Sequence, residues 1–157
     1  MQGRSRFSLV HLLFWLAISY APGVTGVAFQ PDGWYRRIAK PSWTPPDALF
    51  APVWLTLYFL IGLAAYRVAR RDAPATPIAL TWFFGQLLLN ALWTPLFFGL
   101  HRPDLALACI ALLWLTIVGT IRSFARVDGP AGALLVPYLL WVSFASALNA
   151  AIWWLNR

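Results

Sequence analysis

The sequence predicts an all-helical integral membrane protein, a bundle of five transmembrane helices with an aromatic, proline-rich loop between the first two. Of its 157 residues, 61% are hydrophobic and only 11% are charged, whereas soluble domains carry about 25% charged residues. The charged residues leave five uncharged runs, at 7–31, 48–66, 73–100, 105–121 and 129–156. Each run suits one crossing, because a helix of about 17 to 25 apolar residues spans a bilayer. The third observation is that the basic residues lie at the ends of these runs.

Helices are expected at 7–29, 48–68, 77–99, 104–124 and 131–155, within one membrane domain that covers 1–157. Pro22, Gly23 and Gly26 should loosen or kink the second half of the first helix. The connections after the second and third helices are short, so the second, third and fourth helices should be antiparallel neighbours. No internal repeat is visible, which argues against the inverted-repeat plan of many secondary transporters.

The sizeable loop between the first two helices runs from Gln30 to Asp47 and combines four prolines, Trp34, Tyr35 and Trp43 with three basic residues. The segment 31–33 predicts a turn, and 34–39 could form one or two helical turns before Pro41 ends them. A loop so stiff and aromatic is expected to take part in function.

The net charge of +7 would suggest nucleic acid in a soluble protein, but here it indicates membrane orientation and headgroup contact, and no nucleic-acid partner is expected. Five crossings place the termini on opposite sides. The N-terminal side then carries Arg4, Arg6, Arg67, Arg70, Arg71, Arg122 and Arg126, and the other side carries Arg36, Arg37, Lys40, Arg102 and Arg157. This balance weakly favours a cytoplasmic N-terminus.

The first run has one alternative reading, a cleaved signal peptide, because Ser19-Tyr20-Ala21 resembles a small-x-small cleavage site. Pro22 would directly follow the cut, and the apolar character continues to Phe29. A retained first helix is therefore the preferred interpretation.

The uncharged runs exclude several kinds of chemistry. All five aspartates lie in loops or at helix ends, so no carboxylate relay inside the membrane is expected. His11 and His101 should lie on opposite membrane faces, and Cys109 has no evident partner. We therefore expect no metal site and no histidine-ligated haem within one chain.

The chain contains ten tryptophans, and these are the candidate functional residues, because the apolar runs carry no charged side chains. Four near run ends suit an interfacial belt: Trp15, Trp82, Trp153 and Trp154. Trp34, Trp43, Trp54, Trp93 and Trp141 fit a belt less well. Trp54 and Tyr58 share a helix face at i, i+4, and a cavity between such faces would suit a large, planar, mostly apolar ligand.

Two amides lie inside the third run. Gln86, Asn90 and Trp93 share one helix face, and buried amides are costly in hydrocarbon unless they find a partner. An interhelical hydrogen bond and a ligand-facing role remain equally open for them. In the last helix, the small residues 143–147 suit close helix packing.

These residues resemble the translocator protein or tryptophan-rich sensory protein family, also known as the peripheral-type benzodiazepine receptor family. The resemblance covers nearly the whole chain and rests on the order and spacing of its motifs. These are Pro31–Tyr35, Lys40–Pro46, Phe50–Trp54 with Leu57, Tyr58 and Gly62, then Gln86, Asn90, Trp93–Pro95 and Phe97–Gly99, and finally Pro137, Tyr138, Trp141, Leu148 and Asn149.

The resemblance implies a five-helix bundle, usually a homodimer, with a pocket beneath the first loop. It implies binding of protoporphyrin-type tetrapyrroles, of sterol-like lipids and of synthetic isoquinoline or benzodiazepine-type ligands, with porphyrin as ligand or substrate and no resident cofactor. The matching ligand-binding positions are Tyr35, Asn90 and Trp93, joined by Trp54 and Trp141, which are also the candidate catalytic residues of a porphyrin-degrading reaction. We add Trp34 and Trp43 as loop residues of the pocket.

One feature departs from the family pattern. Animal members carry a cholesterol-recognition pattern near the end of the last helix, where this chain has Ala150 and Trp154. This departure speaks against sterol binding there and favours a bacterial membrane, inner or outer. The stretch 63–70 around Tyr66 fits the same loose pattern, which often occurs by chance.

The leading functional interpretation is a membrane receptor or sensor for tetrapyrroles. The alternatives are an enzyme that degrades porphyrin in light and, more weakly, a porphyrin or lipid transporter. Gly85 and Gly99 on the third helix suggest a homodimer through that helix.

Overall fold

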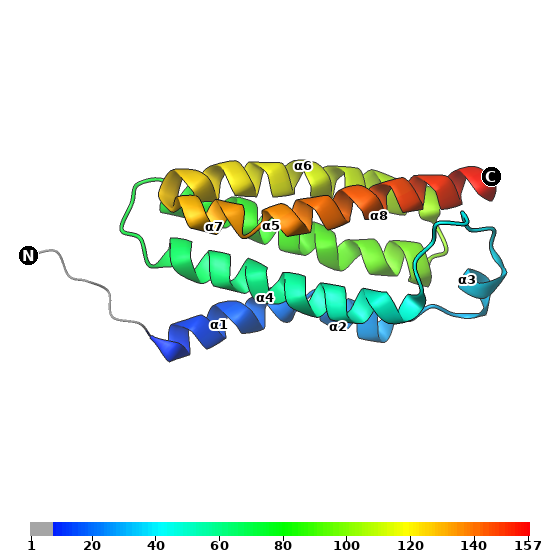
Figure 1. Cartoon of the computed structure of the whole chain (residues 1–157), viewed down its shortest axis with the longest axis horizontal. Helices are drawn as coiled ribbons and strands as arrows, with labels where there is room; N and C mark the ends of the chain where they lie inside the picture. Colours follow the sequence, from blue (N-terminus) through cyan, green and yellow to red (C-terminus); the bar gives the residue numbers. More distant parts are fainter. Residues whose placement is uncertain (1–7) are drawn as a thin grey trace, which may run out of the picture.

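The computed structural model describes residues 8–157, and all their regular structure is helical. The helices lie along one long axis, with the start of α1 and the end of α8 at opposite ends (Figure 1). Their bounds are α1 Leu9–Tyr20, α2 Gly23–Ala28, α3 Gly33–Arg37, α4 Phe50–Ala69, α5 Thr76–Thr94, α6 Pro103–Val127, α7 Gly129–Ala133 and α8 Val136–Leu155, with a 3-10 turn η1 at Asp47–Leu49 and a π turn η2 at Pro95–Gly99.

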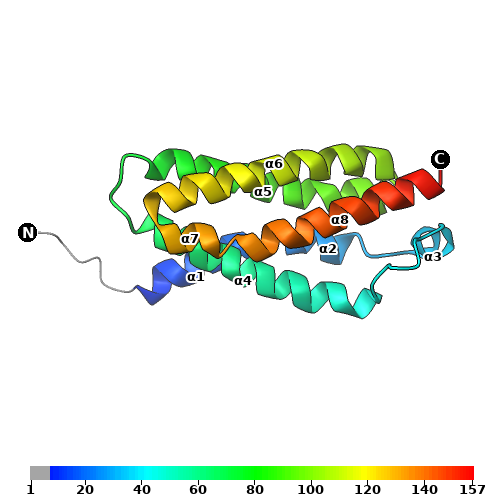
Figure 2. The ribbon, with the colours of Figure 1, turned by 45° about the horizontal axis from the view of Figure 1, so that its top comes forward.

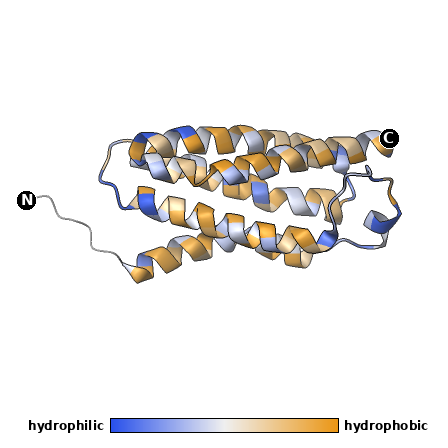
Figure 3. Ribbon diagram, viewed as in Figure 1, coloured by the Kyte–Doolittle hydropathy of each residue, from blue (hydrophilic) through white to orange (hydrophobic). Residues whose placement is uncertain are grey.

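Three helical stretches within 8–157 are long and apolar enough to cross a membrane: Asp47–Ala69, Pro103–Val127 and Gly129–Leu155. Helix α1 is a shorter apolar helix. Hydrophilic residues gather mainly at the two ends of the bundle and in the segment with α3 (Figure 3). The all-helical membrane architecture is thus present, whereas the count of five crossings stays a prediction.

Prolines divide three of the predicted helices. The single helix expected at 7–29 is wrong within the described residues, because α1 ends at Tyr20 and α2 starts after Pro22, whose ring nitrogen carries no hydrogen for the helical ladder. The helix expected at 77–99 gives way to the π turn at Pro95. The helix expected at 131–155 is split into α7 and α8, with Pro137 in the first turn of α8.

The core lies between the packed pairs α1 with α4, α5 with α6, and α6 with α8 (Figure 2). Phe83 on α5, Ile61 on α4, Ile117 on α6 and Val142 on α8 are fully buried within it. Because α1 packs against α4 while α2 lies against α5, the break at Pro22 directs the second half of the first segment away from α4. This divergence leaves room for a cavity.

Gly62 allows α1 to approach α4 closely. A Cβ atom at Gly62 would lie 2.9 Å from the Leu16 Cα and 2.8 Å from its Cδ2. A backbone atom cannot yield as a flexible side chain does, so the helices would have to separate. Gly62→Ala should destabilise the fold by about 1 to 3 kcal/mol, the usual cost of overpacking.

The measurement is the thermal unfolding midpoint in one mild detergent, with Gly26→Ala in α2 as the matched control. A Cβ at Gly26 would meet no neighbouring atom of the described residues within 4 Å, so the control should equal the wild type or gain up to about 1 kcal/mol from helix propensity. Equal midpoints for the two variants would contradict the close approach at Gly62.

A carboxylate joins helices at the end of the bundle opposite α3. The Asp128 side chain is only 1% exposed and pairs with Arg67 of α4 and with Arg71, two residues after the end of α4. Its Oδ1 also accepts a hydrogen bond from the Ala131 backbone at 3.1 Å, which caps α7. Burial alone would raise the pKa of Asp128, but the hydrogen bonds from Arg71 and Arg67 outweigh it and lower that pKa. Arg4 and Arg6, assigned to the same membrane side, lie outside the described residues.

Candidate functional site

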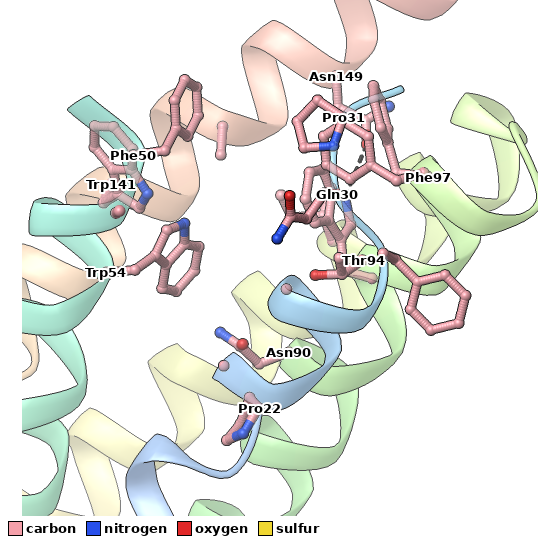
Figure 4. A pocket seen from close by; sticks show the side chains of 18 of the residues that line it. Pro22, Gln30, Pro31, Phe50, Trp54, Asn90, Thr94, Phe97, Trp141 and Asn149 are labelled. Carbon is pink, nitrogen blue, oxygen red and sulfur yellow. Dashed lines mark hydrogen bonds between the residues drawn. The ribbon is translucent and has the colours of Figure 1, made fainter. Parts of the chain in front are cut away.

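A cavity of about 480 Å³ lies between α2, α4, α5 and α8, beneath the segment that carries α3. This volume is typical of small-molecule sites, which range from about 300 to 1,000 Å³. Trp54 and Trp141 lie on one side of it and Thr94 and Phe97 on the other, with the Gln30 amide between them (Figure 4).

The aromatic wall is built from α4 and α8. Trp54 stacks on Tyr58 with ring centroids 5.3 Å apart, and Trp141 meets Phe50 edge to face at 5.7 Å. The i, i+4 spacing of Phe50, Trp54 and Tyr58 places all three on the cavity side of α4. These rings supply flat apolar surface, and they hold one another in position.

Helix α5 contributes the opposite wall through Trp93. Its ring stacks on Phe97 at 5.1 Å, and its Nε1 donates a hydrogen bond to Asn149 Oδ1 at 3.0 Å. Trp93 is therefore fixed at both its face and its edge.

The indole nitrogen of Trp141 has a different status. It is buried and has no hydrogen-bond partner within residues 8–157. Because Trp141 lines the cavity, this N–H is a donor left for an occupant that carries an acceptor.

The floor of the cavity is polar. Tyr58 donates a hydrogen bond to Asn90 Oδ1 at 3.0 Å, Asn90 Nδ2 donates to Tyr138 Oη at 2.8 Å, and Tyr138 donates to Gln86 Oε1 at 2.9 Å. Asn90 thus makes interhelical hydrogen bonds and also lines the cavity, while Gln86 lies behind Tyr138. The interhelical hydrogen bond that was one of the two possibilities for Asn90 is therefore present, and its contact with a ligand stays a prediction.

The segment above the cavity is held at two places. Asp32 accepts hydrogen bonds from the backbones of Trp34 and Tyr35, and its Oδ2 lies 3.1 Å from His101 Nε2. The backbone N–H of Tyr35 contributes most to lowering the pKa of Asp32, and His101 lowers it further. At the second place, the Asn156 side chain forms two 2.9 Å hydrogen bonds with the backbone of Ala39.

The structure brings five predicted site residues to the cavity: Tyr35, Trp54, Asn90, Trp93 and Trp141. Trp34 and Trp43 do not line it in the described chain. Trp34 instead stacks on His101 at 4.5 Å, and Trp43, 48% exposed, packs against Phe144. These two tryptophans attach the loop to the bundle, so direct ligand contact for them stays a prediction.

The site residues predicted from the sequence omit several that line the cavity, among them Gln30, Phe50, Tyr58, Phe97 and Asn149. The sequence placed Tyr58 on the helix face of Trp54 but did not count it as a site residue, and the same i±4 spacing could have identified Phe50. Nothing in local sequence marked Gln30, because its position depends on how α2 ends.

Packing bears on two further features that the sequence analysis named, Tyr66 and Gly99. Tyr66, the centre of the loose cholesterol-type pattern, is buried, and its hydroxyl bonds with Ser8 and Arg70. Gly99 is no free close-approach surface, because a Cβ there would meet the Phe29 ring at 2.8 Å.

These features define a helical membrane protein with an internal, aromatic, ligand-sized cavity beneath a structured loop. The chain matches the TspO/MBR family over residues 10–155 and belongs to that family. It is accordingly a multi-pass membrane protein, which confirms the resemblance drawn from its motifs.

Relatives occur in bacteria and animals. The chain is 44% identical to the tryptophan-rich sensory protein of Cereibacter sphaeroides, over 87% of this chain and 85% of that protein. It is 42% identical to the tryptophan-rich protein TspO of Chlorobaculum tepidum, over 94% and 97% of the two chains. Identity to the human translocator protein is 36%, over 76% and 73%. Among these three relatives, the two bacterial proteins have the higher identities.

Proposed function

We propose that this protein is a membrane receptor or sensor that binds a planar tetrapyrrole of the protoporphyrin IX type in the cavity beneath residues 30–47. The supporting observation is the cavity itself, which carries tryptophan rings from three helices and the Trp141 N–H donor, a group with no hydrogen-bond partner among residues 8–157. Stacking on each ring favours a flat aromatic ligand by about 0.5 to 1.5 kcal/mol beyond area burial. Sterol-like lipids and synthetic isoquinoline-type or benzodiazepine-type compounds are further apolar ligands of the same space.

The proposal includes the membrane arrangement. We infer five crossings, with α1 and α2 as the first segment and α5 with η2 as the third. The opposite placement of the start of α1 and the end of α8 supports an odd number of crossings (Figure 1). We also propose a homodimer through α5, supported by the open space at Gly85 and the exposed Leu88 and Leu92.

A second candidate function is light-dependent porphyrin degradation, which the contact between Trp54 and Tyr58 favours. Both rings are oxidisable, they stack, and Tyr58 is hydrogen-bonded to Asn90. In this alternative, dioxygen would be the oxidant of the photoexcited porphyrin, and Trp54 and Trp141 would be the residues in contact with it.

The two functions are separated by incubating purified protein with protoporphyrin IX in light and in darkness. Binding alone should quench porphyrin fluorescence without loss of pigment in either condition. If pigment is lost faster in light with the native protein than with a heat-denatured sample under the same light, the degrading activity is established instead. Absence of quenching at any protein concentration would exclude both.

A further inference from the structure

The polar floor of the cavity is a single-file chain of hydrogen bonds. It begins at Tyr58 on α4, passes through Asn90 on α5 and Tyr138 on α8, and ends at Gln86 on α5, with donor–acceptor distances of 3.0, 2.8 and 2.9 Å. Tyr58 and Asn90 line the cavity, whereas Gln86 is 1% exposed and lies in the closed interior. The chain therefore has one open end and one closed end.

The hydrogen-bond chain has a direction, because each tyrosine in it has a single hydroxyl hydrogen to donate. A phenol has one hydrogen to donate, and in the observed arrangement Tyr138 gives its hydrogen to Gln86 and Tyr58 gives its hydrogen to Asn90. The Tyr58 oxygen then has only lone pairs left for an occupant of the cavity. In this direction Tyr58 can accept a hydrogen bond from a ligand and cannot donate one.

The closed end has an unpartnered group. Gln86 Nε2 is buried and has no hydrogen-bond partner within residues 8–157, and a buried donor without a partner is costly. A half-turn of the Gln86 amide lets Nε2 donate to Tyr138. When the Asn90 amide also makes a half-turn, Tyr138 donates to Asn90 Oδ1 and Asn90 Nδ2 donates to Tyr58. Three hydrogen bonds are again made, and Gln86 Oε1 takes the place of Nε2 as the atom without a partner among the described residues. The two directions have equal numbers of hydrogen bonds, and no proton leaves its parent atom.

We propose that the direction of this hydrogen-bond chain reverses with the occupant of the cavity. Tyr58 accepts a hydrogen bond from the ligand in one direction and donates one to it in the other. Gln86 and Tyr138 are then positioning residues that set the hydrogen-bonding character of Tyr58 without touching the ligand. The ligand class is a planar apolar ring system that presents either an N–H donor or a nitrogen or carbonyl acceptor at the floor. This inference rests on the proposed function, since it requires a planar ligand in the cavity.

Gln86→Met tests the mechanism by removing both polar atoms from the closed end. Tyr138 then has only Asn90 as a partner, which holds the chain in the direction where Tyr58 donates. The probes are two planar tricyclic compounds of similar shape, carbazole with an N–H donor and 9-fluorenone with a carbonyl acceptor. We expect the carbazole-to-fluorenone ratio of dissociation constants to rise about tenfold, as the loss of one hydrogen bond implies.

Leu87→Met is the matched control, because it places the same side chain at a neighbouring buried position of α5. It should leave the ratio within about twofold of the wild type. Gln86→Leu is a second apolar replacement and should shift the ratio in the same direction as Gln86→Met. A purely structural effect would weaken both probes equally and leave their ratio unchanged.

The decisive comparison repeats Gln86→Met in a Tyr138→Phe background, where the chain is interrupted. There, Gln86→Met should change the ratio less than about twofold, because coupling requires a shared network. An unchanged ratio in the native background, an equal change in both backgrounds, or no binding of either probe by the wild type would overturn the inference. Porphyrin quenching by the same wild-type preparation reports separately on the proposed function.

Discussion

Replacing both Trp54 and Trp141 by alanine should weaken protoporphyrin IX binding by about 30- to 1,000-fold. The two changes remove two ring faces and the Trp141 N–H donor from the same wall. Lost stacking and apolar contact together amount to about 2 to 4 kcal/mol. The measurement is a titration of porphyrin fluorescence in detergent or lipid nanodiscs.

Trp154→Ala is the control for tryptophan removal as such. Trp154 is 61% exposed near the end of α8 and outside the described cavity lining, so its loss should leave affinity unchanged. Unchanged affinity in the double alanine variant would place the binding site elsewhere.

The double Trp54→Phe, Trp141→Phe variant separates recognition from chemistry. Phenylalanine keeps most of the aromatic surface, so affinity should stay within about tenfold, or roughly 1.4 kcal/mol. If the protein degrades porphyrin, this variant should lose turnover while it still binds. Retained light-dependent turnover would exclude both indoles from the reaction.

Asp128→Asn should lower the stability of the bundle by about 2 to 3 kcal/mol. The substitution removes a buried charge that accepts hydrogen bonds from Arg67 and Arg71 and caps α7. A hydrogen bond to a charged group contributes about 1.5 to 3 kcal/mol. The net loss is smaller than the sum of these bonds, because the partly exposed arginines recover hydration when the carboxylate is gone. The thermal midpoint should fall by roughly 5 to 10 °C.

The same carboxylate gives the stability a pH dependence of known sign. The folded pKa of Asp128 is lowered, so its contribution is fully present above the unfolded pKa of about 3.9 and is lost as the pH falls through the folded pKa. Acidification from about pH 7 to pH 3 should therefore destabilise the wild type more than Asp128→Asn.

Asp72→Asn is the matched control, since Asp72 is exposed in the connection between α4 and α5. It should leave both the midpoint and its pH dependence unchanged. The ion-pair explanation fails if Asp128→Asn and the wild type lose stability in parallel on acidification.

The local pattern of the sequence predicted the helical class and five of the residues that line the cavity. Long uncharged runs have few alternatives to helices in a bilayer, because a spanning segment must satisfy its own backbone hydrogen bonds. Spacing along one helix is also a local property, which is why Trp54 and Tyr58 were assigned to one face correctly. The motifs around them were sufficient to recognise the family.

Helix continuity was less predictable. Pro22, Pro95 and Pro137 were visible, but whether a proline bends a helix or divides it depends on what receives the freed carbonyl groups. The Ile18 carbonyl, for example, which a backbone N–H at position 22 would bond in a continuous helix, instead accepts a hydrogen bond from the Ala21 N–H at 3.1 Å.

Composition, the five apolar runs and the tryptophan motifs were therefore determined by the sequence alone, since each is a property of residues close together along the chain. Only the tertiary structure showed that Trp34 stacks on His101, that Phe29 fills the space beside Gly99, and that Asn90 and Gln86 belong to one chain with Tyr138. Each of these contacts joins residues on different elements. Their partners depend on how the helices approach one another, which no local pattern contains.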